Sequence, residues 1–333
     1  MNIISFVWNY AKDLIFPKEK ISMNIDENIL KYFDEKEYLS QFSPKVDILK
    51  IEYSEIHNKL MGIFRYILIT KEISLRVFNL TTEIIKISPW TYEVWVIRRH
   101  CLSDIEEINI YDEIEYLNMI ILNYPKTYQV WHHRRLLIDK LNECSQEKKI
   151  LQKILDEDDK NFHCWSHRIW MIRRFNNAEG EFEFIDKMLE IDVKNNSVWN
   201  YRFFLVEYVN KNKKSKDLSD NIIKNEIKYA FNKIKYCLLN ESPFSYINGF
   251  INKYKRKYRE FEETMKEFEV LYNQNKENIE NCIFILRILL EYYEEEKNEK
   301  KYNIAIDKLI EIDYIRKKYY LWRKQCFNII EKS

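Results

Sequence analysis

Glycine and proline are scarce in this chain, with 3 glycines and 5 prolines among 333 residues. Sheet proteins use glycine in their hairpin turns, and nucleotide-binding α/β folds use it in their phosphate loops. The glycine-rich signatures GxxxxGKS/T, GxGxxG and GxSxG do not occur in the sequence. These absences argue against nucleotide-binding and serine-hydrolase folds, and they predict a helical protein.

The chain also lacks an excess of charge of either sign. Its 54 lysines and arginines are matched by 53 aspartates and glutamates, which gives a net charge of +1. Without an overall basic field there is no general attraction for a polyanion. We therefore expect no nucleic-acid partner.

Paired cysteines and long apolar runs are absent as well. No CxxC occurs, and the cysteines are scattered along the chain: Cys101, Cys144, Cys164, Cys237, Cys282 and Cys326. This usage is typical of buried free thiols in a reduced, intracellular protein, and we expect a cytoplasmic location. The apolar run at residues 3–8 is too short to span a bilayer and lacks the basic region of a signal peptide, so we expect no membrane insertion.

A repeat is the main feature that the sequence does contain. Four segments align without gaps around a tryptophan: PWTYEVWVIRR (89–99), PKTYQVWHHRR (125–135), DKNFHCWSHRI (159–169) and VKNNSVWNYRF (193–203). Their tryptophans follow one another at intervals of 36, 34 and 34 residues. A weaker fifth copy, ESPFSYINGFI (241–251), has Phe244 in the tryptophan position, and a polar loop at 211–221 accounts for its longer interval.

The pattern between the copies is helical. Apolar residues between Asp104 and Leu122 recur with i, i+3, i+4 spacing, which predicts one helix across that range. Similar patterns predict further helices at 55–69, 75–87, 220–239, 253–274, 277–296 and 300–310. Each repeat copy opens with capping residues, such as Thr127 and Asn161, and continues as a second amphipathic helix. Each unit is therefore a helix–turn–helix pair of roughly 34 residues.

Such a pair cannot bury its apolar face alone, so neighbouring pairs must stack. We expect an all-α fold, a right-handed α-α superhelix (solenoid) of about seven helical hairpins. Because no linker rich in Gly, Ser or Pro divides the chain, residues 1–333 are predicted to form a single domain. Its repeats are expected at approximately 55–88, 89–124, 125–158, 159–192, 193–239, 240–275 and 276–326.

The repeated tryptophan and arginine favour a structural role. One large ring at the same place in every repeat fills the space between stacked pairs. An arginine follows one turn later in each copy: Arg98, Arg134, Arg168 and Arg202. We expect a ladder in which these arginines pair with carboxylates or helix-end carbonyls of the next repeat, with direct ligand contact as the alternative.

The histidines do not predict a metal site. His132 and His133 are adjacent, so they point in different directions on a helix. His163 and His167 are four residues apart, but the glutamate of an HExxH motif is missing between them. We expect no metal bound by this chain.

Lysines recur five residues before the tryptophan, at Lys126, Lys160 and Lys194. Stacked repeats align such positions in a row, and each lies near a helix N-terminus, where unpaired N–H groups and the helix dipole favour an anion. A lysine row of this kind can cradle a phosphate or a carboxylate. Solvated lysines on exposed turns explain the pattern equally well.

The repeated motif is specific enough to indicate a family. The segments NYPKTYQVWHHRRLL, DDKNFHCWSHRIWMI, DVKNNSVWNYRFFLV and NESPFSYINGF resemble successive repeats of protein prenyltransferase alpha subunits. The similarity is greatest to the alpha subunit shared by protein farnesyltransferase and type I geranylgeranyltransferase. EYSEIHNKLMGIFR and YIRKKYYLWR are similar to its first and last helices, so the resemblance covers about residues 36–325.

The resemblance implies a crescent of helical hairpins that wraps around a beta subunit, which is the farnesyltransferase beta subunit, the type I geranylgeranyltransferase beta subunit, or both. It implies transfer of farnesyl or geranylgeranyl from the isoprenoid diphosphate to the cysteine of a C-terminal CaaX sequence on a protein substrate. It also implies a catalytic zinc bound by the beta subunit and not by this chain, and magnesium for farnesyl transfer.

The resemblance further assigns roles to single residues. Lys126 corresponds to the lysine that stabilises the departing diphosphate, and Gln129 to the glutamine that binds the terminal carboxylate of the peptide. The other matching positions line the same rim: Tyr128, Asn161 and His163 near the diphosphate, and Tyr92 near the peptide. The family usually has tyrosine where this chain has Phe162, so any hydroxyl contact is lost there.

Two alternatives remain. The alpha subunit of Rab geranylgeranyltransferase has similar repeats, and NFHCW suits it; KTYQVWHHRR favours the CaaX enzymes, because Gln129 would bind a free carboxylate that Rab substrates do not present in this way. The other alternative is a non-enzymatic helical-repeat scaffold of the tetratricopeptide type. Those repeats carry W-x-x-L-G, whereas the tryptophan here is followed by x-x-Arg without glycine, which argues against a scaffold.

Overall fold

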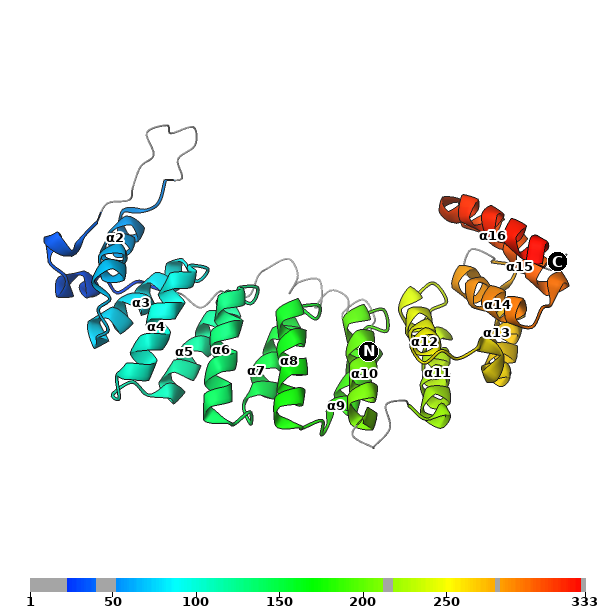
Figure 1. The fold of residues 1–333 in the computed structure, drawn as a ribbon, viewed down its shortest axis with the longest axis horizontal. Helices are drawn as coiled ribbons and strands as arrows, with labels where there is room; N and C mark the ends of the chain where they lie inside the picture. Colours follow the sequence, from blue (N-terminus) through cyan, green and yellow to red (C-terminus); the bar gives the residue numbers. More distant parts are fainter. Residues whose placement is uncertain (1–22, 40–51, 212–217, 279–281, 331–333) are drawn as a thin grey trace, which may run out of the picture. The chain divides into compact units, whose positions relative to one another are not determined.

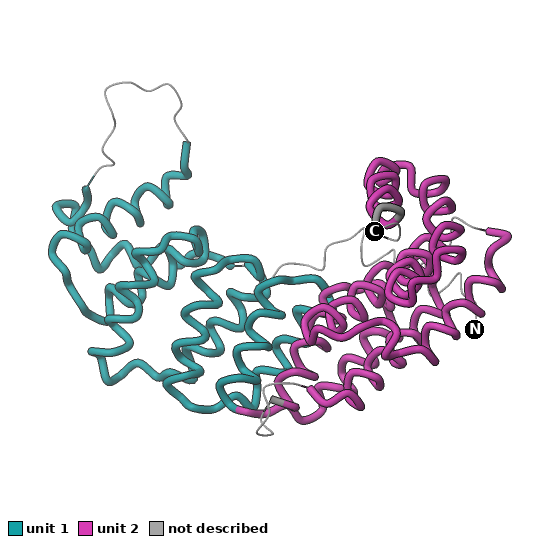
Figure 2. Tube along the Cα trace, turned by 45° about the vertical axis from the view of Figure 1, so that its right-hand side comes forward, with its two compact units in different colours: residues 1–175 teal, residues 176–333 magenta. Residues whose placement is uncertain are grey.

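The computed structural model of the chain describes residues 23–39, 52–211, 218–278 and 282–330. Within these ranges it contains helices and no strand, which confirms the all-α prediction. The chain divides into two compact units, residues 1–175 (unit 1) and 176–333 (unit 2), shown in Figure 2, and each is described by itself. The single-domain expectation stays a prediction. The apolar run 3–8 and residues 212–217 of the polar loop lie outside the described ranges.

Unit 1 consists of helices that pair along the chain and stack on one another (Figure 1). Its helices are α2 (Glu55–Thr70), α3 (Leu75–Ile87), α4 (Tyr92–Asp104), α5 (Ile110–Asn123), α6 (Tyr128–Leu141), α7 (Glu147–Glu157) and α8 (Phe162–Phe175). The pairs α3–α4, α5–α6 and α7–α8 form hairpins, and α4, α6 and α8 pack side by side. These three helices each carry one tryptophan repeat, so their N-terminal turns lie along one edge of the unit.

Unit 2 is also built of helices that pair along the chain. Its helices are α9 (Glu181–Ile191), α10 (Asn196–Lys211), α11 (Asp220–Ile234), α12 (Glu241–Lys253), α13 (Glu262–Asn275), α14 (Ile283–Glu295), α15 (Glu299–Ile312) and α16 (Lys317–Ile330), with short 3₁₀ turns η3 (Tyr258–Phe261) and η5 (Tyr314–Arg316). Successive helices again pair as hairpins, and α10, α12 and α14 pack in one row. The described residues therefore contain the repeated hairpins that the sequence predicts.

Two predicted helices differ from the structure. The range from Asp104 to Leu122 is not one helix, because α4 ends at Asp104 and α5 begins at Ile110. Asn109 caps α5 by accepting the N–H of Tyr111 at 2.9 Å, while apolar residues within the turn keep the helical spacing. The range 253–274 is interrupted as well, since Lys255 adopts a left-handed conformation with φ 53° that ends α12.

The repeated tryptophans form the core, as predicted. The side chains of Trp95, Trp131, Trp165 and Trp199 are at most 6% exposed. Each indole N–H also donates to the carbonyl six residues earlier, at 2.7 to 2.9 Å: Pro89, Pro125, Asp159 and Val193. One residue type therefore fills the core and fixes the turn that precedes its helix, which is the turn carrying the candidate site.

The arginine ladder is present, and its carboxylates lie on the next helix along the chain. Bidentate pairs join Arg98 to Glu113, Arg134 to Glu147 and Arg202 to Glu226, with N···O distances from 2.6 to 3.1 Å. Each arginine is on the second helix of a hairpin and each glutamate is on the first helix of the next hairpin. A third residue, on the second helix of that next hairpin, completes each group: His133, His167 and Tyr246. Two of the four histidines that were considered for a metal, His133 and His167, thus serve as partners of buried glutamates.

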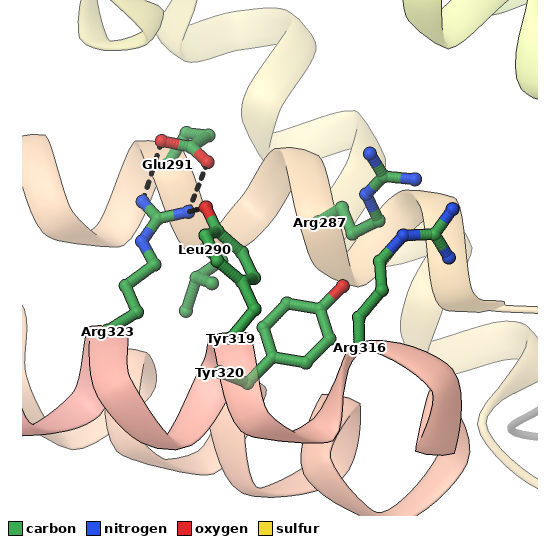
Figure 3. A pocket seen from close by; sticks show the side chains of 7 residues that line it. All are labelled: Arg287, Leu290, Glu291, Arg316, Tyr319, Tyr320 and Arg323. Carbon is green, nitrogen blue, oxygen red and sulfur yellow. Dashed lines mark hydrogen bonds and ion pairs between the residues drawn. The ribbon is translucent and has the colours of Figure 1, made fainter.

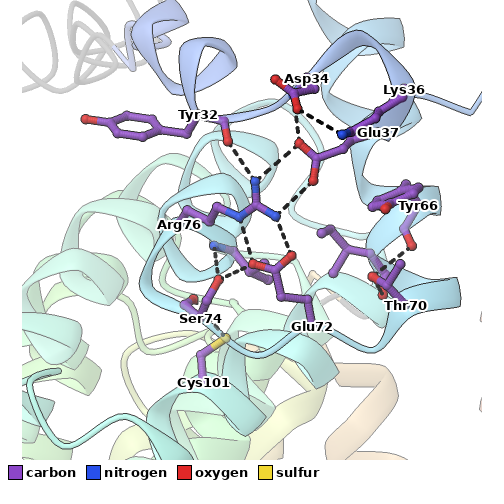
Figure 4. A network of polar contacts seen from close by, with 12 residues as sticks. Tyr32, Asp34, Lys36, Glu37, Tyr66, Thr70, Glu72, Ser74, Arg76 and Cys101 are labelled. Carbon is purple, nitrogen blue, oxygen red and sulfur yellow. Dashed lines mark hydrogen bonds and ion pairs between the residues drawn. The ribbon is translucent and has the colours of Figure 1, made fainter.

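An N-terminal strap (residues 23–39) lies across α2 and α3, and Arg76 is its main anchor (Figure 4). The guanidinium of Arg76 donates to both oxygens of Glu37 at 2.9 and 3.3 Å and to the carbonyl of Tyr32 at 2.8 Å. The ring of Tyr38 packs against Gly62 so closely that a Cβ there would lie 2.0 Å from its Cε2. Gly62 therefore permits the strap to dock.

Candidate functional site at the helix N-termini of unit 1

The residues that the sequence analysis singled out gather at one edge of unit 1. They come from the turns before α4, α6 and α8 and from the first turns of these helices, and several contacts connect these segments. The amide Nε2 of Gln129 donates to the carbonyl of Trp90 at 3.0 Å. The rings of Tyr128 and His163 meet edge to face with centroids 4.2 Å apart, and the Lys126 ammonium lies 3.1 Å from a carboxylate oxygen of Asp158. We call this group the rim.

Lys126 combines a fixed backbone with an accessible ammonium. The carbonyl of the preceding Pro125 accepts from the indole of Trp131 at 2.8 Å and from the amide of Asn161 at 3.4 Å. The Lys126 side chain is nevertheless 75% exposed. Its charge is therefore held on a rigid turn at the surface, where it can meet an anionic ligand.

Gln129 is oriented by Trp90, which lies in the turn before α4. The Trp90 carbonyl accepts one N–H of the Gln129 amide, and this bond fixes the orientation of the amide group. A primary amide has two N–H groups, so a second donor and the carbonyl oxygen remain for a ligand. This arrangement suits a carboxylate, which accepts hydrogen bonds and carries no proton at neutral pH.

His163 is held neutral within an aromatic cluster. Partial burial, reinforced by the charges of Arg135 and Lys126, lowers the pKa of its ring below the usual value. Its ring also contacts Trp131 and Phe162, with centroids 6.4 and 5.5 Å away. A neutral imidazole can donate one hydrogen bond and accept another, so His163 adds no fixed positive charge to the rim.

Asn161 is engaged by the protein itself. It is buried, its side-chain oxygen caps α8 by accepting the N–H of Cys164 at 2.9 Å, and its amide reaches the Pro125 carbonyl. The equivalent Asn195 caps α10 in the same manner, with the N–H of Ser197 at 3.0 Å. Asn161 thus holds the Lys126 turn in place.

Four large aromatic side chains on the rim are exposed. Their exposed fractions range from 57 to 67%: Trp90, Tyr92, Tyr128 and Phe162. Aromatic rings gathered on a surface are costly to leave in water and are enriched at protein interfaces. The rim is therefore suited to lie against a partner or a substrate, and Phe162 offers it a ring without a hydroxyl.

Sequence reasoning missed two neighbours of the rim. Asp158, the counter-ion of Lys126, precedes its tryptophan by seven residues, as Asp192 does in the following repeat. Trp90 occupies the lysine position of the first copy and supplies the carbonyl that orients Gln129. The available signals were a repeated aspartate in one case and a departure from the repeated lysine in the other, but the pairing depends on contacts between successive turns.

The lysine row can be described in part. Lys126 and Lys160 are both exposed on the turns before α6 and α8, as the pattern predicts. Lys194 is exposed at the equivalent turn of unit 2. Both lysines of unit 1 lie near helix N-termini, where an anion is favoured, and Asp158 partly balances the charge of Lys126.

No metal site is formed by the part of the chain that the structure describes, since no group of three or more His, Cys, Asp or Glu side chains is arranged to bind a metal ion there. Among the described helices, none combines the length and the apolar character needed to cross a membrane.

Unit 2 contains a cavity of about 320 Å³ between α14 and α16 (Figure 3). Its lining includes three arginines, each already paired with carboxylates: Arg287 with Glu241, Arg316 with Asp313, and Arg323 with Glu291. Because the acidic partners balance the positive charge, this cavity has no evident preference for an anion. The rim of unit 1 is the stronger candidate site.

Comparison with known proteins supports the family that the repeat motif indicates. A family model described as the protein prenyltransferase alpha subunit repeat matches residues 110–141, 144–175 and 178–209. The protein farnesyltransferase/geranylgeranyltransferase type-1 subunit alpha of Candida albicans is 33% identical over 263 residues, covering 77% of this chain and 83% of that protein. The chain belongs to the protein prenyltransferase alpha-subunit family. The resemblance seen in the sequence is thereby confirmed.

Further relatives of this prenyltransferase alpha-subunit chain agree. The protein of the same name from Dictyostelium discoideum is 37% identical over 285 residues, covering 82% of this chain and 85% of that protein. A solved structure, Candida albicans protein geranylgeranyltransferase-I complexed with GGPP, has a similar fold with a TM-score of 0.75 and 28% identity, covering 89% of this chain and 99% of that one. The alpha-subunit helical-repeat fold is therefore supported by both sequence and structure.

Proposed function

We propose that this chain is the alpha subunit of a heterodimeric CaaX protein prenyltransferase. The enzyme transfers a farnesyl or geranylgeranyl group from its diphosphate to the cysteine of a C-terminal CaaX sequence. Family membership and the names of the relatives support this proposal. The observation that carries it is the rim, where Lys126, Gln129 and the exposed aromatic rings lie together at one edge of unit 1.

Lys126 is the residue to which we assign catalysis. When the isoprenoid leaves, negative charge accumulates on the diphosphate, and a fixed ammonium stabilises that charge more in the transition state than in the ground state. The turn that carries Lys126 is held by hydrogen bonds from Trp131 and Asn161 to the Pro125 carbonyl. The backbone that bears the ammonium is then already in place when charge develops, which favours electrostatic catalysis.

The remaining rim residues bind the two substrates. The second N–H of the Gln129 amide donates to the terminal carboxylate of the peptide, and Tyr92 lies against the peptide. Tyr128 and His163 line the diphosphate side, with their rings packed together. Asn161 positions the Lys126 turn instead of exposing its own amide.

The metal ions are assigned outside this chain. The catalytic zinc belongs to the beta subunit, where it supplies a bound and activated thiolate of the substrate cysteine, and magnesium supports farnesyl transfer. The described residues of this chain form no group that could hold either ion. The partner is the farnesyltransferase beta subunit, the type I geranylgeranyltransferase beta subunit, or both, in a cytoplasmic enzyme.

Co-expression tests the proposal. The chain is expressed with each beta subunit of its own organism, and transfer to a CaaX peptide is measured with farnesyl and geranylgeranyl diphosphate. We expect co-purification with at least one beta subunit, transfer by the complex, and zinc that remains with the beta subunit after separation. A stable monomer with no affinity for either beta subunit would contradict the proposal, as would stoichiometric zinc on this chain alone.

A matched peptide pair separates the CaaX proposal from the Rab alternative. A CaaX peptide with a free terminal carboxylate is compared with the same peptide amidated at its C-terminus. Because Gln129 is assigned to the carboxylate, we expect the amidated peptide to be a poor substrate. Equal transfer to both peptides would contradict the role assigned to Gln129. Assembly only with the Rab geranylgeranyltransferase beta subunit would favour the Rab enzyme.

A further inference from the structure

The counter-ion of Lys126 comes from the neighbouring hairpin. Asp158 follows the last residue of α7, and one of its carboxylate oxygens lies 3.1 Å from the Lys126 ammonium. Its own backbone is fixed, since its N–H donates to the Ile154 carbonyl at 2.9 Å and its carbonyl accepts the N–H of Asn161 at 3.0 Å. The backbone of Asp158 is therefore anchored, and its short side chain gives the carboxylate few positions, whereas the lysine side chain is long and exposed.

The hydrogen bonds already described hold the backbone of the Lys126 turn and leave its ammonium unconstrained. A lysine side chain has four rotatable bonds, and confining it costs conformational entropy. If the ammonium becomes ordered only when negative charge develops on the leaving diphosphate, this cost adds to the barrier of the transfer step. An anchored carboxylate beside the ammonium reduces the number of positions that the charge can occupy before the ligand arrives.

We infer that Asp158 is a positioning residue for Lys126: its carboxylate restrains the ammonium at the rim, and this restraint speeds isoprenoid transfer. The inference rests on the proposed function of Lys126. Asp158 does not itself touch the substrate, and its negative charge opposes binding of an anionic diphosphate. Asp158 therefore raises the rate of transfer and lowers the affinity for the diphosphate. A residue with only a structural role would not change these two quantities in opposite directions.

The equivalent residue of the next repeat provides a matched control. Asp192 also follows the last residue of its helix, α9, and precedes its tryptophan by seven residues. Its carboxylate accepts the N–H of Lys194 at 2.9 Å. Replacing Asp192 by asparagine removes a carboxylate from the same structural position without removing the charge beside Lys126.

The test measures the single-turnover transfer rate and the affinity for the isoprenoid diphosphate separately, in the assembled heterodimer. The variants are Asp158→Asn, Asp192→Asn, Lys126→Ala and the double variant Asp158→Asn with Lys126→Ala. An exposed ion pair contributes about twofold to fivefold in a rate or an equilibrium. We expect Asp158→Asn to slow transfer by about this factor while diphosphate affinity is unchanged or higher, and Asp192→Asn to leave both values unchanged.

The double variant decides whether Asp158 acts through Lys126. If it does, adding Asp158→Asn to Lys126→Ala produces no further loss. An unchanged or faster rate in Asp158→Asn, a weaker diphosphate affinity, or an equal loss with and without Lys126 would each overturn the inference. An inactive wild-type heterodimer would instead overturn the proposed function, so the two failures are distinguishable.

Discussion

Glu147 provides the sharpest test of what holds the repeats together. Its buried carboxylate accepts two hydrogen bonds from Arg134, at 2.9 and 2.6 Å, and one from His167 at 2.7 Å. All three side chains are at most 1% exposed. Replacing Glu147 by glutamine keeps the shape but removes the negative charge, so the guanidinium of Arg134 is left buried without a counter-ion.

The expected loss can be estimated from this geometry. Removing one partner of a buried ion pair costs about 3–5 kcal/mol, because the remaining charge stays out of water without compensation. The amide oxygen of glutamine can still accept one bond, and Arg134 keeps its 2.8 Å bond to the side-chain oxygen of Asn118, so larger values are not expected. At about 2–4 °C per kcal/mol for a unit of this size, the melting midpoint should fall by about 6–20 °C.

Thermal unfolding of the full chain in its heterodimer measures the effect. Glu55→Gln is the matched control, because Glu55 pairs with Lys59 on the exposed surface of α2 and should show little change. A second variant combines Glu147→Gln with Arg134→Met, which removes the stranded charge and should recover part of the loss. A midpoint for Glu147→Gln within about 2 °C of wild type, or a double variant that is less stable than the single one, would refute the reasoning.

Three further predictions follow from the same structure. The free energy of unfolding should decrease as the pH falls below about 6.5. Burial lowers the pKa values of His133 and His167, so below that pH the unfolded chain binds more protons than the folded chain. A melting midpoint that stays flat from pH 7.5 to 5 would contradict this prediction. Gly62→Ala should displace the Tyr38 ring and release the N-terminal strap, visible as faster proteolysis within residues 23–39, and unchanged cleavage would count against it. Lys126→Ala should slow transfer by about 10²–10³-fold with a smaller loss of diphosphate affinity, and unchanged turnover in the heterodimer would remove its assigned role.

The pKa of Glu147 extends the expected acid sensitivity. Burial opposes its ionisation, but hydrogen bonds from His167 and Arg134 outweigh this effect and lower its pKa to about 2. The unfolded carboxyl titrates near 4.5, so the stability that this residue contributes is present above that pH and is lost as the pH falls toward 2. The histidines therefore act first on acidification and the glutamate later.

The repeat could be predicted from the sequence because periodicity and residue type are local properties. A tryptophan every 34 to 36 residues, with apolar helical spacing between copies, predicted hairpins with a tryptophan core, and the core positions are confirmed. Helix ends were harder to place. The segment after Asp104 kept an apolar period through the turn at 105–109, where Asn109 caps the start of α5.

The partners of each repeated residue could not be predicted in the same way. The sequence indicated that Arg134 needs a carboxylate, but not that this carboxylate belongs to Glu147 and also pairs with His167 on the next helix, α8. Such triads depend on how three helices pack, which a one-dimensional pattern does not contain. The same holds for Asp158, whose carboxylate meets Lys126 only because successive turns stack.

The sequence by itself determined the helical class, the repeat and the motif that places this chain among prenyltransferase alpha subunits, because these depend on residue types at fixed intervals. It also indicated Lys126 and Gln129 through that motif. The tertiary structure decided which side chains remain accessible: Asn161 became a buried cap, while Lys126 kept an exposed ammonium on a rigid turn. The physical reason is that burial and pairing are settled between helices distant in sequence, where each polar group takes the partner that packing brings within reach.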